Sequence, residues 1–285
     1  NIQARMLRGV ESSGMICAAS ELGLPQAAQG IWHLSDSAEV GMTLAAHLNQ
    51  SADTHLTVEV TPNRGDCLSV HGLAREVSVV SKQALSLPNA LNDLPELLLT
   101  NTAVQVKADP GCVQYHVLLI DQIDLSRMLP IELTQRLSLL GQASSNPIVD
   151  ILNYVMFELG QPLHAYDADQ IDMRSLAVGQ NHPGVELALL SGESVSLQTG
   201  DWVVSSNGQP IALAGVMGGK LSAVTDQTQR VLIEAATFNP EEIAKTCRRL
   251  GLSSESAFRF ERGVDPQLVA WALQRAQALI CEHLS

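Results

Sequence analysis

The polar side chains best placed for chemistry surround a tight corner within ILNYVMFELGQPLHAYD, residues 151–167. An apolar stretch of helical character ends at Gly160, a Gly-Gln-Pro turn follows, and His164 stands just beyond it. Asn153 and Glu158 lie on the stretch before the turn. Alone, a histidine in this position is more often structural, and the other two residues are more often helix-surface or capping residues. The corner is therefore a candidate site only in combination with other features.

A second candidate is Glu234, which interrupts the apolar stretch VLIEAATF at residues 231–238. A carboxylate among leucine, isoleucine and alanine is costly unless it is paired or used. Side chains alternate between the two faces of a strand, so Glu234 shares its face with Leu232 and Ala236. These apolar neighbours favour a pocket over a solvated surface.

Two further stretches leave both a functional and a structural interpretation open. LAGVMGG, residues 213–219, has neither the phosphate-loop nor the dinucleotide-binding pattern. It is either a strand that enters a tight turn or a wall where only glycine lets the backbone approach a ligand. Residues 245–266 hold the one basic cluster, which could bind an RNA end or form a solvated helix face: Lys245, Arg248, Arg249, Arg259 and Arg262.

Composition excludes several classes of protein. The net charge of −13 argues against a general nucleic-acid binder, so any RNA contact must be local or shared with a partner chain. Five widely spaced cysteines without a Cys-x-x-Cys motif argue against a disulfide framework and a zinc site. We expect reduced thiols, a cytoplasmic protein, no resident metal or cofactor, and no membrane span. The first residues lack an initiator methionine, which suggests a piece of a longer polypeptide.

The elements that must position these residues predict a mixed α+β, multi-domain chain. We expect a small β-rich and helical N-terminal part at residues 1–50, a small α+β domain at 51–90 and a larger mixed-sheet domain at 91–285. A linker is predicted over residues 86–99. Helices are predicted near 67–82, with Asp66 as N-cap, and near 128–140, 147–159, 239–250 and 265–284. Strands are predicted near 55–61, 103–108, 113–121, 185–191, 201–206, 210–215 and 230–237.

Four stretches together resemble the beta subunit family of bacterial phenylalanyl-tRNA synthetases. They are VTPNRGDCLSVHGLAREV, ILNYVMFELGQPLHAYD, LAGVMGG with VLIEAATFNP, and GLSSESAFRFERGVDP. The resemblance covers nearly the whole chain. It implies that residues 1–50 end an oligonucleotide-fold tRNA-binding domain and that residues 91–285 form the editing domain, which hydrolyses tyrosine wrongly attached to tRNA(Phe).

The resemblance also implies partners and site residues. The whole enzyme would be an (αβ)2 heterotetramer that charges tRNA(Phe) with phenylalanine, using ATP and Mg²⁺ on the alpha subunit. In the editing pocket, Asn153 and His164 would position the ester and the attacking water, and Glu234 would accept the phenol proton of tyrosine. The remaining pocket positions implied are two wall glycines, Gly215 and Gly218, and two serines: Ser254 stands where threonine is usual, and Ser256 stands where many members have alanine.

Three departures from the family keep an alternative open. Gln114 and Ala143 stand where many members carry arginine, and Leu152 stands where threonine is usual. A structural, tRNA-docking scaffold with decayed editing is therefore the rival hypothesis, and a metal hydrolase is a weaker third. The water-activating group also stays open between His164 and the terminal hydroxyl of the tRNA.

Overall fold

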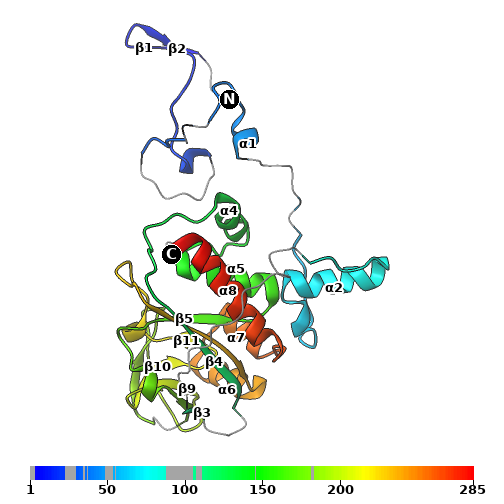
Figure 1. Ribbon diagram of the computed structural model, residues 1–285, viewed down its shortest axis with the longest axis vertical. Helices are drawn as coiled ribbons and strands as arrows, with labels where there is room; N and C mark the ends of the chain where they lie inside the picture. Colours follow the sequence, from blue (N-terminus) through cyan, green and yellow to red (C-terminus); the bar gives the residue numbers. More distant parts are fainter. Residues whose placement is uncertain are drawn as a thin grey trace. The chain divides into compact units, whose positions relative to one another are not determined.

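Figure 1 shows the computed structural model, which describes residues 4–22, 30–34, 36, 38–48, 54, 56–87, 105–106, 111–144, 146–180 and 183–285. The chain forms two compact units, Asn1–Thr57 with Leu129–Ser145, and Val58–Met128 with Asn146–Ser285. The domain boundaries predicted near residues 50 and 90 stay predictions, and most of the predicted linker lies outside the described residues. The mixed α+β class is confirmed.

The smaller unit contains short elements. Strands β1 (Arg5–Leu7) and β2 (Val10–Ser12) pair in an antiparallel hairpin whose turn has positive φ at Arg8 and Gly9. The 3-10 helix η1 (Ser20–Leu22) and helix α1 (Leu44–His47) follow, and the Thr43 side chain caps α1. Helix α4 (Ile131–Leu139) completes this unit and confirms the helix predicted near 128–140.

The larger unit is built around a three-stranded antiparallel sheet in the order β4-β12-β5. Its strands are β4 (Cys112–Ile120), β12 (Val231–Phe238) and β5 (Leu163–Asp167). A five-stranded sheet has the order β11-β10-β9-β6-β3, and β7 pairs with β8. These strands are β3 (Gln105–Val106), β6 (Ala177–Gly179), β7 (Glu186–Ala188), β8 (Ser194–Ser196), β9 (Val203–Ser206), β10 (Gln209–Leu213) and β11 (Met217–Gly218).

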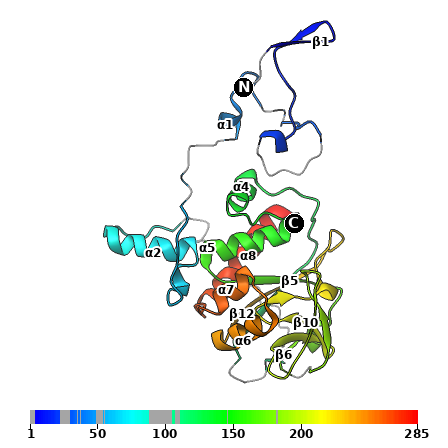
Figure 2. The same ribbon diagram turned by 180° about the vertical axis from the view of Figure 1, so that it is seen from behind.

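The larger unit also contains helices, which are labelled in Figures 1 and 2, and short 3-10 turns. The helices are α2 (Val70–Ser81), α5 (Pro147–Leu159), α6 (Pro240–Leu250), α7 (Glu255–Phe260) and α8 (Leu268–Leu284). The turns are η2 (Gly65–Cys67), η3 (Met173–Ser175) and η4 (Lys220–Ser222). Among the described residues, no helix has the length and apolar character that crossing a membrane requires.

Side chains along β12 alternate between the two faces of the three-stranded sheet, and both faces are covered. Leu232, Ala236 and Phe238 belong to a buried apolar cluster that also contains residues of β9 and β10. Helices α5 and α8 pack against the three-stranded sheet and against each other. All eight residues of β12 are buried, which explains why its sequence is apolar on both faces. Glu234 shares the parity of the cluster residues, as the sequence predicts.

Local sequence signals explain several boundaries. Asn207 and Gly208 both have positive φ, the conformation that a tight two-residue hairpin turn between β9 and β10 requires. Asn239 caps α6 through the amide of Glu241, and Gly251 ends that helix with φ of 66°. These features were predicted from the sequence.

The segment before α2 differs from its prediction. Residues 56–61, predicted as part of a strand, form none. Ser69, rather than Asp66, caps α2 by accepting from the amide of Gly72. Two valines of α2 are also largely exposed: Val77 is 65% and Val80 is 83% exposed. Asp66 instead takes part in an ion-pair cluster, because Arg64 lies beside it.

Candidate functional site

The register of the central sheet brings the two main candidates face to face. Glu234 on β12 is paired with His164 on β5 and with Val117 on β4. Directly opposite residues in an antiparallel pair project from the same face with their Cβ atoms about 5 Å apart. Residues 70 positions apart in the sequence therefore form one local cluster.

The Gly-Gln-Pro corner fixes this register. Helix α5 begins with the Asn146 side chain as its cap and ends at Gly160, whose φ of 92° is the left-handed conformation that stops the helix. The next residue, Gln161, is fully buried, and its amide Nε2 donates to the carbonyl oxygen of Ala236 at 2.9 Å. This bond ties the corner to β12, and His164 follows three residues later.

Glu234 is buried, and two tyrosine hydroxyls donate to its carboxylate. Tyr115 on β4 donates to Oε2 at 2.6 Å, and Tyr166 on β5 donates to the same oxygen at 2.5 Å. Burial raises the pKa of Glu234, and the two hydrogen bonds oppose that rise because they favour the charged form. The pKa values of both phenols lie well above the ordinary value, chiefly because of burial and the adjacent carboxylate, so they remain donors.

His164 is a neutral imidazole at physiological pH. Burial lowers its pKa from the ordinary 6.5 to about 4. Its ring and that of Tyr166 form a T-shaped pair, with ring centroids 4.5 Å apart at 86°. A neutral imidazole has one nitrogen that can accept a hydrogen bond from water, but a group with this pKa is a weak base.

The two predicted wall glycines are constrained in different ways. Gly215 has φ of +69°, and an added Cβ would lie 2.7 Å from Phe238 Cδ2, so packing and backbone conformation both require glycine there. At Gly218 an added Cβ would lie 2.4 Å from Cε1 and 2.6 Å from Nε2 of His164. The absence of a side chain at Gly218 therefore makes room for the imidazole itself.

Several of these residues line one cavity of about 70 Å³. The five predicted site residues in its lining are His164, Gly215, Gly218, Glu234 and Ser256. Apolar residues in the remaining wall include Leu213, Val216, Met217 and Phe260, and Tyr166 also belongs to the lining. A hollow that combines apolar residues with a few convergent polar groups is typical of a small-molecule site. The roles of the lining residues in binding or hydrolysis stay predictions.

Ser254 supports the wall from outside the lining. Its hydroxyl donates to the carbonyl oxygen of Val216 at 2.7 Å and accepts from the amide of Ala257 at 3.0 Å. It thus caps α7 and ties this helix to the glycine-rich turn. Ser256, two residues later, lies in the lining itself.

The two α5 residues do not join this cavity. Asn153 is half-buried on α5 and is not part of the lining. Glu158 forms an ion pair with Arg275 of α8 at 2.8 Å, with side chains 15% and 10% exposed. Glu158 therefore joins two helices. Leu152 is buried in the same helix, where an apolar side chain fits.

The basic cluster at residues 245–266 is largely paired within the chain. Arg259 is 3% exposed, bonds to Glu255 and to the carbonyl oxygen of Leu68, and stacks over the ring of Phe157. Ion pairs also hold three other cations of this cluster: Lys245 with Glu242, Arg249 with Asp201, and Arg262 with Glu261. Arg259 is a structural cation and is not exposed to an RNA phosphate.

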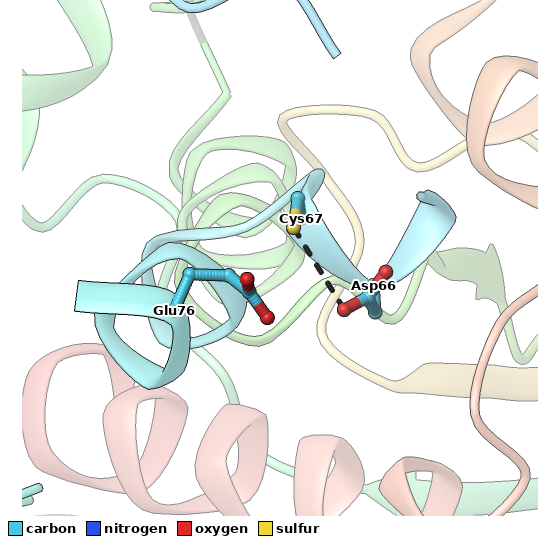
Figure 3. A group of neighbouring side chains, drawn as sticks. All are labelled: Asp66, Cys67 and Glu76. Carbon is cyan, nitrogen blue, oxygen red and sulfur yellow. Dashed lines mark hydrogen bonds between the residues drawn. The ribbon is translucent and has the colours of Figure 1, made fainter. Parts of the chain in front are cut away.

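Figure 3 shows a group of three potential metal ligands in the larger unit: Asp66, Cys67 and Glu76. Their ligand atoms lie within 4.8 Å of one another. Arg64 lies between the two carboxylates, 2.8 Å from Asp66 Oδ2 and 2.6 Å from Glu76 Oε1. The guanidinium lowers the pKa of Asp66 through its hydrogen bonds and accounts for the proximity of the acids. We assign no metal to this group.

Sequence reasoning missed three residues of the site. The alternation His164-Ala165-Tyr166 in β5 could have placed Tyr166 beside His164, because residues two apart in a strand share a face. Tyr115 and Gln161 carry no comparable signal. Their contacts with β12 depend on the pairing of strands that lie far apart in the sequence.

Comparisons with known proteins identify relatives over almost the whole chain. Residues 111–285 match the B3/4 domain family. The "Phenylalanine--tRNA ligase beta subunit" of Legionella pneumophila (strain Lens) is 41% identical over 280 residues, 98% of this chain and 35% of the relative. The proteins of that name from Psychrobacter arcticus and Neisseria meningitidis serogroup A are 41% identical over 276 residues and 40% over 282. They are covered over 34% and 36% of their length, so the chain spans about a third of these curated relatives.

Proposed function

The chain belongs to the B3/4 domain family, and from that membership we propose that it is part of a phenylalanine–tRNA ligase beta subunit in which the Glu234 cavity hydrolyses mischarged Tyr-tRNA(Phe). The observation that carries the proposal is a buried carboxylate beside a neutral imidazole in a hollow lined by both apolar and polar groups. The partners would be the alpha subunit, tRNA(Phe), phenylalanine and tyrosine. Activation of the amino acid with ATP and Mg²⁺ would occur on the alpha subunit.

Selectivity follows from what phenylalanine leaves unpaired. A synthetic pocket shaped for phenylalanine rejects an analogue with one added hydroxyl by only about 10²-fold. In the Glu234 cavity, the phenol of a tyrosyl group would donate to the carboxylate. A phenylalanyl group would leave that acceptor without its donor, at a cost of roughly 1–3 kcal/mol or more for a charged group. The second pocket therefore complements the first.

The proposed reaction is hydrolysis of an ester. Water attacks the carbonyl carbon of the tyrosyl ester, the bond from that carbon to the ribose oxygen breaks, and the ribose oxygen takes a proton. The products are tyrosine and uncharged tRNA. The neutral imidazole of His164 can accept a hydrogen bond from the attacking water, and the adjacent terminal hydroxyl of the tRNA can share this task.

The test is release of tyrosine from Tyr-tRNA(Phe) by the intact protein that contains this chain. We expect release by the wild type and its loss in Gly218→Trp, because the indole would displace His164 and fill the cavity. Leu221→Trp is the matched control, since Leu221 is 77% exposed and outside the lining. Release that is equal in all three proteins would contradict the proposal.

A tRNA-docking scaffold without hydrolysis is the second candidate. It is favoured by Asn153, which lies outside the cavity lining, and by Gln114, which stands where many family members carry arginine. Under this alternative, the intact protein would support charging of tRNA(Phe) and would release no tyrosine from Tyr-tRNA(Phe). The assay above therefore separates the two candidates.

A further inference from the structure

The two oxygens of the Glu234 carboxylate have different surroundings. Oε2 accepts both phenol hydroxyls, from Tyr115 and from Tyr166. Within the described part of the chain, Oε1 accepts no hydrogen bond, and Glu234 is part of the cavity lining. An ionised carboxylate offers about four lone-pair sites, and a single oxygen with two donors is saturated.

The geometry of the sheet produces this arrangement. Tyr115 is paired with Ala236 and Tyr166 with Leu232. The two tyrosines therefore lie opposite the positions two residues to either side of Glu234 on β12. Diagonal neighbours on a sheet face are within reach of long aromatic side chains. The two phenols approach the same oxygen from flanking strands. They prevent the carboxylate from rotating without the loss of two hydrogen bonds.

We infer that Tyr115 and Tyr166 are positioning residues that saturate Oε2 of Glu234 and thereby reserve Oε1 as the single acceptor for the phenol of a bound tyrosyl group. This inference rests on the proposed function and deepens it, because it assigns selectivity to two residues besides Glu234. The phenols also compensate the carboxylate without a cation. A lysine or arginine in their place would compete for Oε1.

The other groups that face Glu234 leave this assignment intact. From β4 the titratable groups are Tyr115 and the buried thiol of Cys112, and from β5 they are His164 and Tyr166. The lining residues of the β10–β11 turn and of α7 are glycine, serine or apolar residues and do not titrate. The two phenols are thus the groups that hydrogen-bond to the carboxylate and favour its charged form.

The test compares Tyr115→Phe and Tyr166→Phe with the wild type in the intact protein. The quantity measured is the ratio of deacylation rates for Tyr-tRNA(Phe) and Phe-tRNA(Phe) across pH, because the intrinsic pH dependence of ester hydrolysis cancels in that ratio. Loss of a donor raises the pKa of Glu234, so the midpoint of selectivity moves to higher pH. At pH 7 we expect the ratio to fall roughly tenfold or more, the usual worth of a hydrogen bond to a charged group.

Tyr154→Phe is the matched control. Tyr154 is the remaining tyrosine of the chain, lies on α5, and is outside the cavity lining. We expect its ratio and midpoint to coincide with those of the wild type. A uniform fall of the ratio in Tyr115→Phe or Tyr166→Phe without a midpoint shift would show mere structural support and would overturn the inference, as would unchanged ratios.

A binding measurement separates this inference from the proposed function. Calorimetric titration with tyrosinamide and phenylalaninamide requires no hydrolysis. Preference of the wild type for tyrosinamide, weakened in both phenylalanine variants, would support the assignment of Oε1 even if the protein released no tyrosine from tRNA. Equal affinity of the wild type for the two amides would overturn it.

Discussion

Glu158 and Glu234 are two carboxylates of the larger unit that are largely removed from water, and they are compensated in opposite ways. Glu158 meets the guanidinium of Arg275 through two hydrogen bonds, so both of its oxygens are used. Glu234 has two phenols on one oxygen and lies in the lining of a cavity. The first arrangement joins α5 to α8. The second leaves Oε1 of Glu234 available to accept a hydrogen bond from a ligand, which is what a recognition site requires.

The largest effect on stability is expected from removal of the ion pair of Glu158. Arg275→Met removes the partner of Glu158 and leaves its carboxylate unpaired between two helices. We expect the free energy of unfolding, measured by urea titration, to fall by about 3–5 kcal/mol. The tyrosine-over-phenylalanine ratio of the folded protein should not change. A fall in that ratio in the folded variant would show that the two carboxylates are coupled.

The two wall glycines, Gly215 and Gly218, allow a second comparison between a structural position and a position in the cavity. Gly215→Ala requires a left-handed alanine and crowds Phe238, so we expect roughly 2–4 kcal/mol of destabilisation. Gly218→Ala should destabilise less, because its Cβ meets His164 in the cavity, but it should slow tyrosine release more. Thermal unfolding and deacylation measured on both variants test this. The reverse order of effects would contradict the account.

The pH dependence of stability tests the lowered pKa of His164. Its folded-state pKa of about 4 lies below the ordinary 6.5, so its contribution to stability is fully present above pH 6.5 and is lost as the pH falls through about 4. The full shift corresponds to roughly 3–4 kcal/mol at most. His164→Gln should therefore lose less stability than the wild type between pH 7 and pH 4.5 in urea titrations. Parallel losses would show that the imidazole keeps its ordinary pKa in the folded protein.

The smallest effect is expected at Ser256. Its side chain is half-buried in the lining, and alanine differs only by the hydroxyl. Ser256→Ala should change the free energy of unfolding by about 0.5 kcal/mol or less and leave the tyrosine-over-phenylalanine ratio within about twofold. A large fall in the ratio would give the hydroxyl a part in recognition that Glu234 alone does not explain.

The sequence predicted best what short-range chemistry decides. The Asn-Gly hairpin, the Asn239 cap and the apolar alternation around Glu234 depend on neighbouring residues, and each appears where it was expected. The segment before α2 was predicted poorly, because Ser69 and Asp66 are both good caps and the choice depends on Arg64. Tyr115 beside Glu234 could not be predicted, since strand register places together residues 119 positions apart.

The most direct test of the central claim is the ratio of deacylation rates for Tyr-tRNA(Phe) and Phe-tRNA(Phe) in Glu234→Gln, which keeps the shape of the side chain and removes its charge. With the intact protein at pH 7, we expect the preference for tyrosine to fall by about tenfold or more. The fold should remain, because no buried charge is left unpaired. A preference equal to that of the wild type, in a variant of normal stability, would show that Glu234 does not recognise the phenol.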